Sequence, residues 1–260
     1  MNIYVFKCRQ SAARHAAEML ADFVAGRPRA VLGLATGGTM PPVYENFLSI
    51  SAQQKIALSG IRSFNLDEYV GLPSGHSQSY CHFMRQHLFD HIDADKSRLA
   101  LPHGDAVDAA SEAHQYDEAI RQAGGIDLQL LGLGANGHIG FNEPGSSFSS
   151  RTRVESLSDE TRFANARFFA NGEDVPSHAI TMGIGTILEA KRILLLATGI
   201  EKASASRAMI EGTIDEQLPA SALRRHADVT ILLDEAAASQ LSPDTQVIRY
   251  RGTESINDVA

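Results

Sequence analysis

The chain has 260 residues and a formal net charge of −8. That charge argues against a nucleic-acid or anionic-membrane partner, because such partners are bound by clustered Lys and Arg and the sequence has no basic run. With 43% hydrophobic and 21% charged residues, the composition is globular and excludes a disordered or fibrous chain.

Short runs rich in Val, Ile and Leu alternate along the chain with longer segments whose apolar residues recur every three or four positions. The short runs lack strict alternation and predict strands buried on both faces, whereas the longer segments predict helices that lay one face on a sheet. In chain order the predicted strands are 3–6, 30–34, 61–66, 128–133, 193–197 and 229–233, and the predicted helices are 12–25, 41–48, 79–88, 107–123 and 202–210. This order predicts an α/β fold with a doubly wound, mostly parallel sheet flanked by helices, Rossmann-like, in a single domain over residues 1–260.

The stretch 145–176 is different. It is polar, rich in Ser, Arg, Asn and Phe, and carries no strand signal. Long irregular segments in compact domains are usually functional or mobile. We therefore expect an insertion or a lid here.

The cysteines and the amino-terminal residues give evidence about the cellular compartment in which the protein works. Cys8 and Cys81 are too few and too far apart for a disulfide framework or a cysteine-based zinc site, which favours a reducing cytoplasm. The opening MNIYVFK lacks the regions of a signal peptide, and apolar stretches such as 192–198 are far shorter than the ~20 residues of a membrane span. We expect a cytoplasmic protein without a membrane segment.

In a doubly wound sheet, ligands bind outside the carboxyl ends of the strands. The second predicted strand is followed by Thr36, Gly37, Gly38 and Thr39, and Pro41 suits the first turn of a helix. Backbone amides, two hydroxyls and a helix amino terminus can together bind a phosphate. A tight turn with threonine caps is an equally good interpretation of this segment alone, and no Walker A lysine follows it.

Two adjacent carboxylates, Asp67 and Glu68, follow the third predicted strand. A carboxylate in a cleft can act as a general base. Because neighbouring side chains point in different directions, at most one of the two should be catalytic. Solvated helix caps are the alternative interpretation.

The fourth predicted strand leads into a glycine-rich loop with a literal G-x-G-x-x-G. It does not predict dinucleotide binding, because the glycines open no long helix and the loop is broken by Pro144. Instead it gathers Asn136, His138 and Glu143 within eight residues. A histidine held by side-chain oxygens suits proton transfer near neutral pH, although a structural histidine in a turn would have the same pattern.

Other charged and metal-ligating residues give weaker signals. His87 and His91 could share a helical face, but no third ligand is evident, so we predict no metal. Arg167 and Lys202 would by default be solvated cations. Lys202, however, follows the fifth predicted strand, at the edge where a ligand phosphate would bind.

Taken together, these segments resemble the glucosamine-6-phosphate deaminase (isomerase) family over residues 30–233. The similar segments occur in the family's order and spacing: LGLATGGTMPPVY, FNLDEYVGL followed by SQSY, GANGHIGFNEPGSSFSSRTR, TRFANARFF and SHAITMGIGTILEAKRILLLATGIEKA. The resemblance implies that an amino-hexose 6-phosphate is converted to fructose 6-phosphate and ammonia without a cofactor.

The resemblance also implies roles for individual residues. His138, oriented by Asn136 and Glu143, would open the sugar ring, and Asp67 would carry the C2 proton to C1. Water would then displace ammonia at C2. The substrate-binding residues implied are Thr36, Gly37, Gly38, Thr39, Gly137, Arg167 and Lys202, with Arg167 brought inward by the lid.

Two departures from the family pattern matter. Many members carry aspartate where this chain has Asn136. Hexameric members activated by N-acetylglucosamine 6-phosphate bind the effector's phosphate partly with a lysine two residues after an arginine, and here Glu155 follows Arg153 at that spacing. The resemblance therefore leaves a homo-oligomer open but predicts no activation by that effector.

Three alternatives remain at this point. A galactosamine-6-phosphate deaminase would have the same motifs, since the C4 stereochemistry is not legible from them. A 6-phosphogluconolactonase shares a similar G-x-x-G-H turn, but NLDEY and FNEP favour deamination. A non-catalytic sugar-phosphate sensor is disfavoured because Asp67, His138 and Glu143 are all present.

Overall fold

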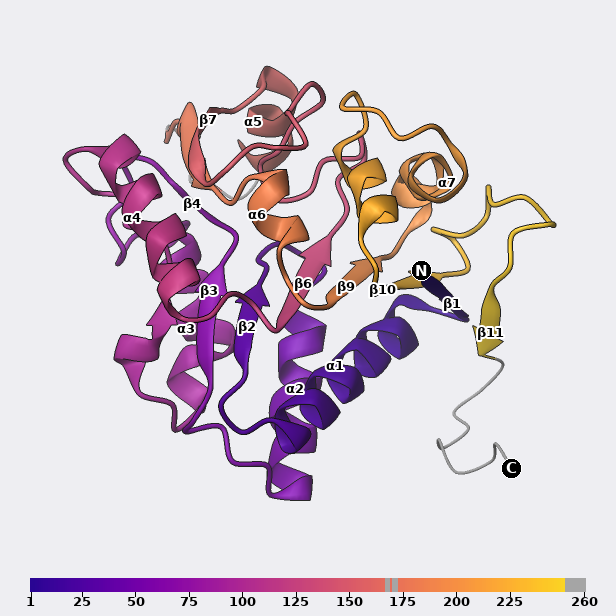
Figure 1. Cartoon of the computed structure of the whole chain (residues 1–260), viewed down its shortest axis with the longest axis horizontal. Helices are drawn as coiled ribbons and strands as arrows, with labels where there is room; N and C mark the ends of the chain where they lie inside the picture. The colour runs from indigo at the N-terminus through magenta and orange to yellow at the C-terminus, as the bar shows by residue number, and fades with distance from the viewer. Residues whose placement is uncertain (167–168, 170–172, 251–260) are drawn as a thin grey trace.

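A computed structural model of the chain describes residues 1–166, 169 and 173–250. Its centre is an eight-stranded sheet in the order β11-β1-β10-β9-β6-β2-β3-β5, with every pair parallel (Figure 1). The strands of this sheet are β1 (Asn2–Phe6), β2 (Val31–Leu34), β3 (Arg62–Asn65), β5 (Leu99–Ala100), β6 (Leu128–Gly132), β9 (Ile193–Ala197), β10 (Val229–Asp234) and β11 (Ile248–Tyr250). All six predicted strands are found in it, which confirms the predicted doubly wound α/β fold.

Helices lie on both sides of the sheet, with α1 and α2 on one side and α6 and α7 on the other (Figure 1). The helices are α1 (Arg9–Gly26), α2 (Pro41–Gln54), α3 (Tyr80–His87), α4 (Ala109–Gln122), α5 (Asp159–Ala166), α6 (Ile184–Leu188) and α7 (Ala203–Glu211), with short 3₁₀ turns η1 (Phe89–His91), η2 (Lys96–Arg98), η3 (Ile200–Lys202) and η4 (Pro219–Arg225). Pro41 stands in the first turn of α2, as predicted. Ser79 and Asp108 cap α3 and α4 through side-chain oxygens that accept backbone N–H groups.

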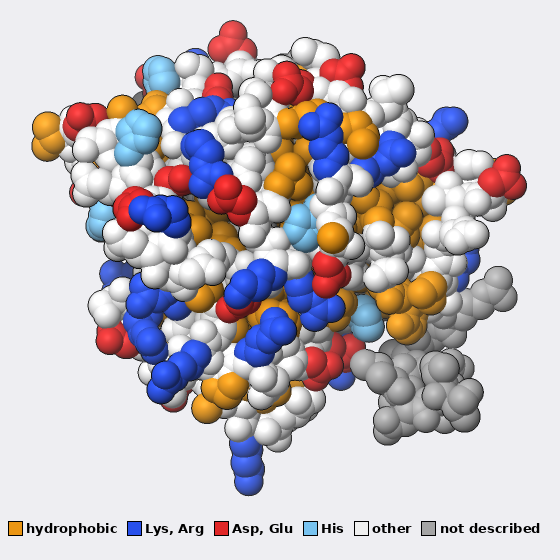
Figure 2. Space-filling view, in the orientation of Figure 1, with side chains coloured by type: hydrophobic (Ala, Val, Ile, Leu, Met, Phe, Trp, Pro, Cys, Tyr) orange, Lys and Arg blue, Asp and Glu red, His pale blue; other side chains and the backbone are white. Residues whose placement is uncertain are grey.

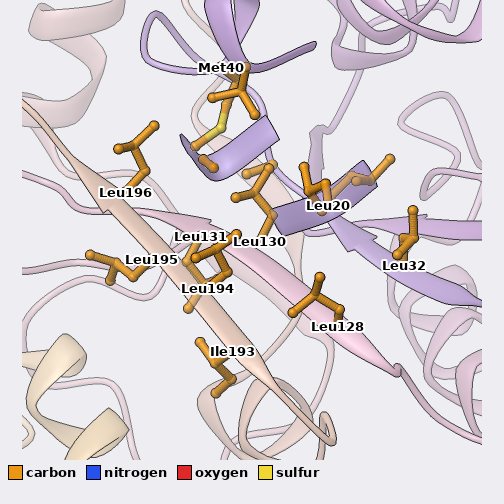
Figure 3. Close-up of a cluster of buried hydrophobic side chains, with 14 of the residues drawn as sticks. Leu20, Leu32, Met40, Leu128, Leu130, Leu131, Ile193, Leu194, Leu195 and Leu196 are labelled. Atoms are coloured by element: carbon orange, nitrogen blue, oxygen red, sulfur yellow. The ribbon is translucent and has the colours of Figure 1, made fainter. Parts of the chain in front are cut away.

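The core lies between the sheet and these helices. The central strands β6 and β9 are leucine-rich, and their side chains fill both faces of the sheet (Figure 3). Their register pairs Leu130 with Leu194 and Leu131 with Leu195, all four fully buried. This two-sided burial explains why the strands lack the alternation of a half-exposed sheet.

The direction of winding reverses between β2 and β6. From β2 the chain adds β3 and β5 on one side, and β6, β9, β10 and β1 occupy the other. The loops that follow β2 and β6 therefore diverge and leave a crevice at the carboxyl ends of these strands. This crevice is where the sequence predicts a ligand.

A second, antiparallel sheet in the order β4-β8-β7 lies beside this edge. It consists of β4 (Asp67–Tyr69), β7 (Arg153–Ser156) and β8 (His178–Thr181). The expectation that 145–176 contains no strand is wrong, because β7 lies within it. The sequence Arg-Val-Glu-Ser has a single apolar residue, so its strand depends on pairing with β8 and gives no local signal.

The third predicted strand, 61–66, corresponds to β3, and a further strand, β4, begins directly after Leu66, which is the junction. Its N–H donates to Leu34 O in the main sheet (3.0 Å), and its C=O accepts from Met182 N beside β8 (2.7 Å). Asp67 consequently belongs to the small sheet rather than to a loop.

The sequence predicts neither a membrane nor a nucleic-acid partner, and the helices and the surface of the structure relate to these two predictions. Within the described residues, no helix is long and apolar enough to cross a membrane. Over the face drawn in Figure 2, acidic and basic side chains are interspersed.

Candidate active site

A cavity of about 400 Å³ opens at the crevice between β2 and β6. Several parts of the chain surround it: the loop after β2, the start of β4, the start of α3, the loop after β6, the helix α5 and the end of η3. The sequence-predicted residues that line it are Thr36, Gly37, Gly38, Thr39, Asp67, Asn136, His138 and Lys202. Residues from four distant segments thus meet in one place.

The loop after β2 presents unpaired backbone donors to the cavity. Among the described residues, no hydrogen-bond acceptor is found for the backbone N–H groups of residues 36–39, while the next amide, Met40 N, donates to Gly37 O (3.0 Å). The loop stands directly before the amino terminus of α2, whose dipole favours an anion. Lys202, at the end of η3, adds a cation to the same cavity. This part of the site has the chemistry of a phosphate pocket.

Asp67 and Glu68 point to different places. Asp67 lines the cavity and is only 6% exposed, and no described residue donates a hydrogen bond to its carboxylate. Burial, with a smaller contribution from Glu68, raises the pKa of Asp67 to about 8. Glu68 instead accepts the backbone N–H groups of Tyr69, Tyr80 and Cys81 (2.8–2.9 Å) and so anchors the first turn of α3.

Asn136 joins His138 to Glu143. Its Oδ1 accepts from His138 Nδ1–H (2.7 Å) and from the His138 backbone N–H (3.2 Å), and its Nδ2 donates to Glu143 Oε2 (2.9 Å). His138 Nδ1 also lies 4.0 Å from Glu143 Oε2. Because Nδ1 is the donor, the neutral ring carries its lone pair on Nε2.

The charge state of His138 follows from its surroundings. Burial lowers the pKa of His138; the nearby Glu143 carboxylate opposes this shift and Lys202 reinforces it. The imidazole is therefore neutral near pH 7, with an available base at Nε2. A neutral histidine with one free nitrogen can accept and return a single proton.

Two glycines shape the loop that holds this histidine. A Cβ on Gly134 would lie 2.3 Å from His138 Nδ1, so only glycine lets the ring approach the backbone there. Gly137 has φ +85° and its Cα faces the Leu218 side chain. Gly137 and Glu143 are not among the residues that line the cavity. Arg167 lies outside the described residues.

Three further polar side chains line the cavity: Tyr80 from α3, and Thr161 and Asn165 from α5. The sequence reasoning missed all three. A local signal for α5 exists, since Ser158 followed by Asp159 is typical of a helix start. Their proximity to Asp67 and His138, by contrast, is a product of the tertiary fold.

The arginines of the SRTR segment are already paired. Arg151 bonds Asp117 (2.8 Å) and Glu189 (2.6 Å). Arg153 pairs with Glu155 (2.5 Å) and donates to Asn142 Oδ1 (2.9 Å). The carboxylate that sequence analysis placed beside Arg153 thus contacts its guanidinium.

The two histidines considered as metal ligands have other contacts. His91 bonds Gln86 O (2.8 Å), and His87 contacts the Phe83 ring. No group of three His, Cys, Asp or Glu side chains arranged to hold a metal occurs in the described part of the chain.

Comparison with known proteins places the chain in a family. Residues 7–232 match the family model of glucosamine-6-phosphate isomerases and 6-phosphogluconolactonases. The glucosamine-6-phosphate deaminase of Shewanella loihica is 48% identical over 250 residues, which cover 96% of this chain and 93% of that protein. The protein of the same name from Bacillus pumilus is 48% identical over 239 residues, covering 92% and 99%.

Solved structures agree with these sequence matches. A monomeric glucosamine-6-phosphate deaminase superimposes with a TM-score of 0.90 at 46% identity and covers 92% of this chain and 100% of that one. The 6-phosphogluconolactonase of Trypanosoma cruzi shares the fold, with a TM-score of 0.73 at 22% identity over 93% and 97% of the two chains. The chain belongs to the glucosamine-6-phosphate isomerase and 6-phosphogluconolactonase family.

Proposed function

We propose that this protein converts glucosamine 6-phosphate and water to fructose 6-phosphate and ammonia. The observation that carries the proposal is the meeting of a buried carboxylate, Asp67, and a neutral imidazole, His138, in one cavity with the amides of residues 36–39. An aldose-to-ketose conversion needs one group that opens the ring and one that moves a carbon-bound proton. The two residues offer these two chemistries.

In the first step, His138 opens the pyranose ring. Nε2 accepts the proton of the anomeric hydroxyl, and the imidazolium returns it to the ring oxygen as the C1–O5 bond breaks. Asn136 Oδ1 keeps the proton on Nδ1 throughout (2.7 Å), and Glu143 stabilises the transient positive charge. Before substrate binds, burial keeps the imidazole neutral, so that Nε2 can accept this proton.

In the second step, Asp67 moves the C2 proton to C1. The carboxylate removes the C2 proton while O1 takes a proton from the substrate's own ammonium group, which gives an enolamine. The carboxylic acid then delivers its proton to C1, which leaves a protonated imine at C2. A poorly solvated carboxylate with a raised pKa is a stronger base than an ordinary one, and because this pKa is about 8 the ionised, active fraction of Asp67 grows as the pH rises towards that value. Water adds to the imine carbon and ammonia leaves, so that no cofactor enters the balance.

The phosphate would bind the amides of residues 36–39 and Lys202. Both lie in the same cavity as Asp67 and His138, as one small substrate requires. We also propose that Arg167 contributes from residues 145–176 acting as a lid, and that Gly137 acts by shaping the histidine loop. An acidic chain can bind an anion in this way, because the positive groups it needs are local.

A substrate panel tests this function. Purified protein is incubated separately with glucosamine 6-phosphate, galactosamine 6-phosphate and 6-phosphogluconolactone, and the release of ammonia or of acid is followed. We expect ammonia from glucosamine 6-phosphate. Ammonia from galactosamine 6-phosphate alone would assign the other epimer as substrate, and acid from 6-phosphogluconolactone alone would assign a lactonase. No release from any of the three substrates would overturn the enzyme proposal.

Substituting Asn136 by Asp is expected to raise the pKa of His138. The added carboxylate would face both His138 and Glu143, and a negative charge raises the pKa of an imidazole, at about 1.4 kcal/mol per unit. The histidine would then be neutral only at higher pH. The measurement is an NMR titration of the His138 ring protons between pH 5 and 9 for both proteins, because the pH profile of kcat also contains the ionisation of Asp67 near pH 8, and superimposable titrations would contradict the assigned role of Asn136.

N-acetylglucosamine 6-phosphate is expected not to activate the enzyme. The guanidinium of Arg153, which would have to bind the effector's phosphate, is already paired with Glu155 (2.5 Å), and this carboxylate repels an added anion. Rates measured over a range of substrate concentrations should be hyperbolic and the same with and without the effector. A rise in activity, or a sigmoidal curve made hyperbolic by the effector, would contradict this expectation.

Location and assembly stay predictions. The sequence predicts a cytoplasmic protein and leaves a homo-oligomer open, while the related solved structure is described as monomeric. Light scattering on the eluting peak of a size-exclusion column measures the mass directly.

A further inference from the structure

The helix α5 contacts the cavity at both of its ends. Near its start, Thr161 Oγ1 donates to Glu143 Oε1, and Ser158 Oγ donates to the same oxygen over a longer distance (3.3 Å). Near its end, Asn165 Nδ2 donates to Tyr69 Oη (2.9 Å). Thr161 and Asn165 both line the cavity. The helix therefore joins Tyr69 of β4 to the carboxylate behind His138.

Glu143 is held from two sides. Asn136 Nδ2 bonds Oε2 (2.9 Å), and the hydroxyl of Thr161 bonds Oε1. Thr161 is only 8% exposed, so water competes poorly for this oxygen. Without the Thr161 hydroxyl, Oε1 would keep only the longer hydrogen bond from Ser158 (3.3 Å), so that the carboxylate could rotate and the amide that orients His138 would rotate with it.

We propose that Thr161 is a positioning residue for ring opening. Its hydroxyl holds the Glu143 carboxylate, which bonds Asn136, and Asn136 in turn orients the His138 ring. The three side chains thereby keep a fixed arrangement. Hydrogen bonds to charged groups are strong and directional, which suits this role. The proposal rests on the proposed function.

The test replaces Thr161 by Val, which keeps the shape and removes the donor. We expect kcat per binding site to fall about 10- to 100-fold, as for a lost hydrogen bond to a charged group, with KM within about threefold. Calorimetric titration with fructose 6-phosphate counts the intact sites, so that a loss of folded protein is not mistaken for a loss of rate. A second variant, Thr161→Ala, should give the same result and replaces the first if that one does not fold.

Two controls make the result specific. Thr161→Ser keeps the hydroxyl and should restore kcat to within about threefold of native. Phe163→Ala alters an 85% exposed side chain on the same helix and should leave kcat unchanged. A native kcat per site in both Thr161→Val and Thr161→Ala, or a serine variant as slow as the valine one, would overturn the proposal. Native protein that releases no ammonia would refute the proposed function instead.

Discussion

Replacing Asp67 by Asn is expected to lower kcat for ammonia release by about 10²- to 10⁴-fold, the contribution of a general base. The amide keeps the shape of the side chain but cannot take the C2 proton. Substrate binding should persist, because the amides of residues 36–39 and Lys202 are unchanged. Exchange of the C2 hydrogen with solvent deuterium, followed by NMR, should be lost together with ammonia release.

The same variant should not be less stable than native protein. The pKa of Asp67 is raised from 3.8 to about 8, so the folded state holds a proton that the unfolded state releases. The free energy of unfolding of the native protein therefore falls as the pH rises from about 4 to about 8. The asparagine variant has no such contribution from residue 67. Its Tm should exceed the native value by a margin that grows across that range.

The matched control is Glu68→Gln, the neighbouring buried carboxylate. Glu68 bonds three backbone N–H groups, one of which would face an amide nitrogen in the variant. This change should lower Tm and leave most of kcat. If Asp67→Asn kept more than a tenth of kcat, or if Glu68→Gln were the inactive variant with a native Tm, Asp67 would not be the base.

Replacing His138 by Gln has the second-largest expected effect, a fall in kcat of about 10²- to 10⁴-fold. Without the imidazole, the enzyme depends on sugar rings that open spontaneously in solution. The rate of ammonia release should therefore reach a plateau as the variant's concentration is raised, because the uncatalysed opening becomes limiting. Native protein should show no such plateau.

His91→Gln is the control for this change, since His91 is exposed and bonds only a backbone carbonyl outside the cavity. It should match native protein in kcat and KM. A His138→Gln variant within tenfold of native kcat would contradict ring opening by His138.

Much of the site could be predicted because it follows the strongest local signals. The polar residues just beyond the apolar runs of β2 and β6, such as Thr36 and His138, must lie at the carboxyl edge of a parallel sheet. The separate roles of Asp67 and Glu68 were also expected, since adjacent extended residues point to opposite faces.

The missed parts depend on contacts between distant segments. The three residues of β4 and the four of β7 form strands only because β8 lies between them. Thr161 has a local helix signal, but nothing near it in sequence indicates that its hydroxyl meets Glu143. The raised pKa of Asp67 likewise results from burial by the fold and leaves no trace in the residues beside it.

The central claim is that this cavity deaminates glucosamine 6-phosphate through a proton carried from C2 to C1 by Asp67. NMR of the product formed from C2-deuterated glucosamine 6-phosphate tests it most directly. Asp67 is only 6% exposed, so the deuteron that it removes from C2 exchanges slowly with solvent. We therefore predict fructose 6-phosphate with part of the deuterium at C1, formed by native protein and not by Asp67→Asn. No fructose 6-phosphate from native protein, or the same labelled product at the native rate from the variant, would contradict the claim.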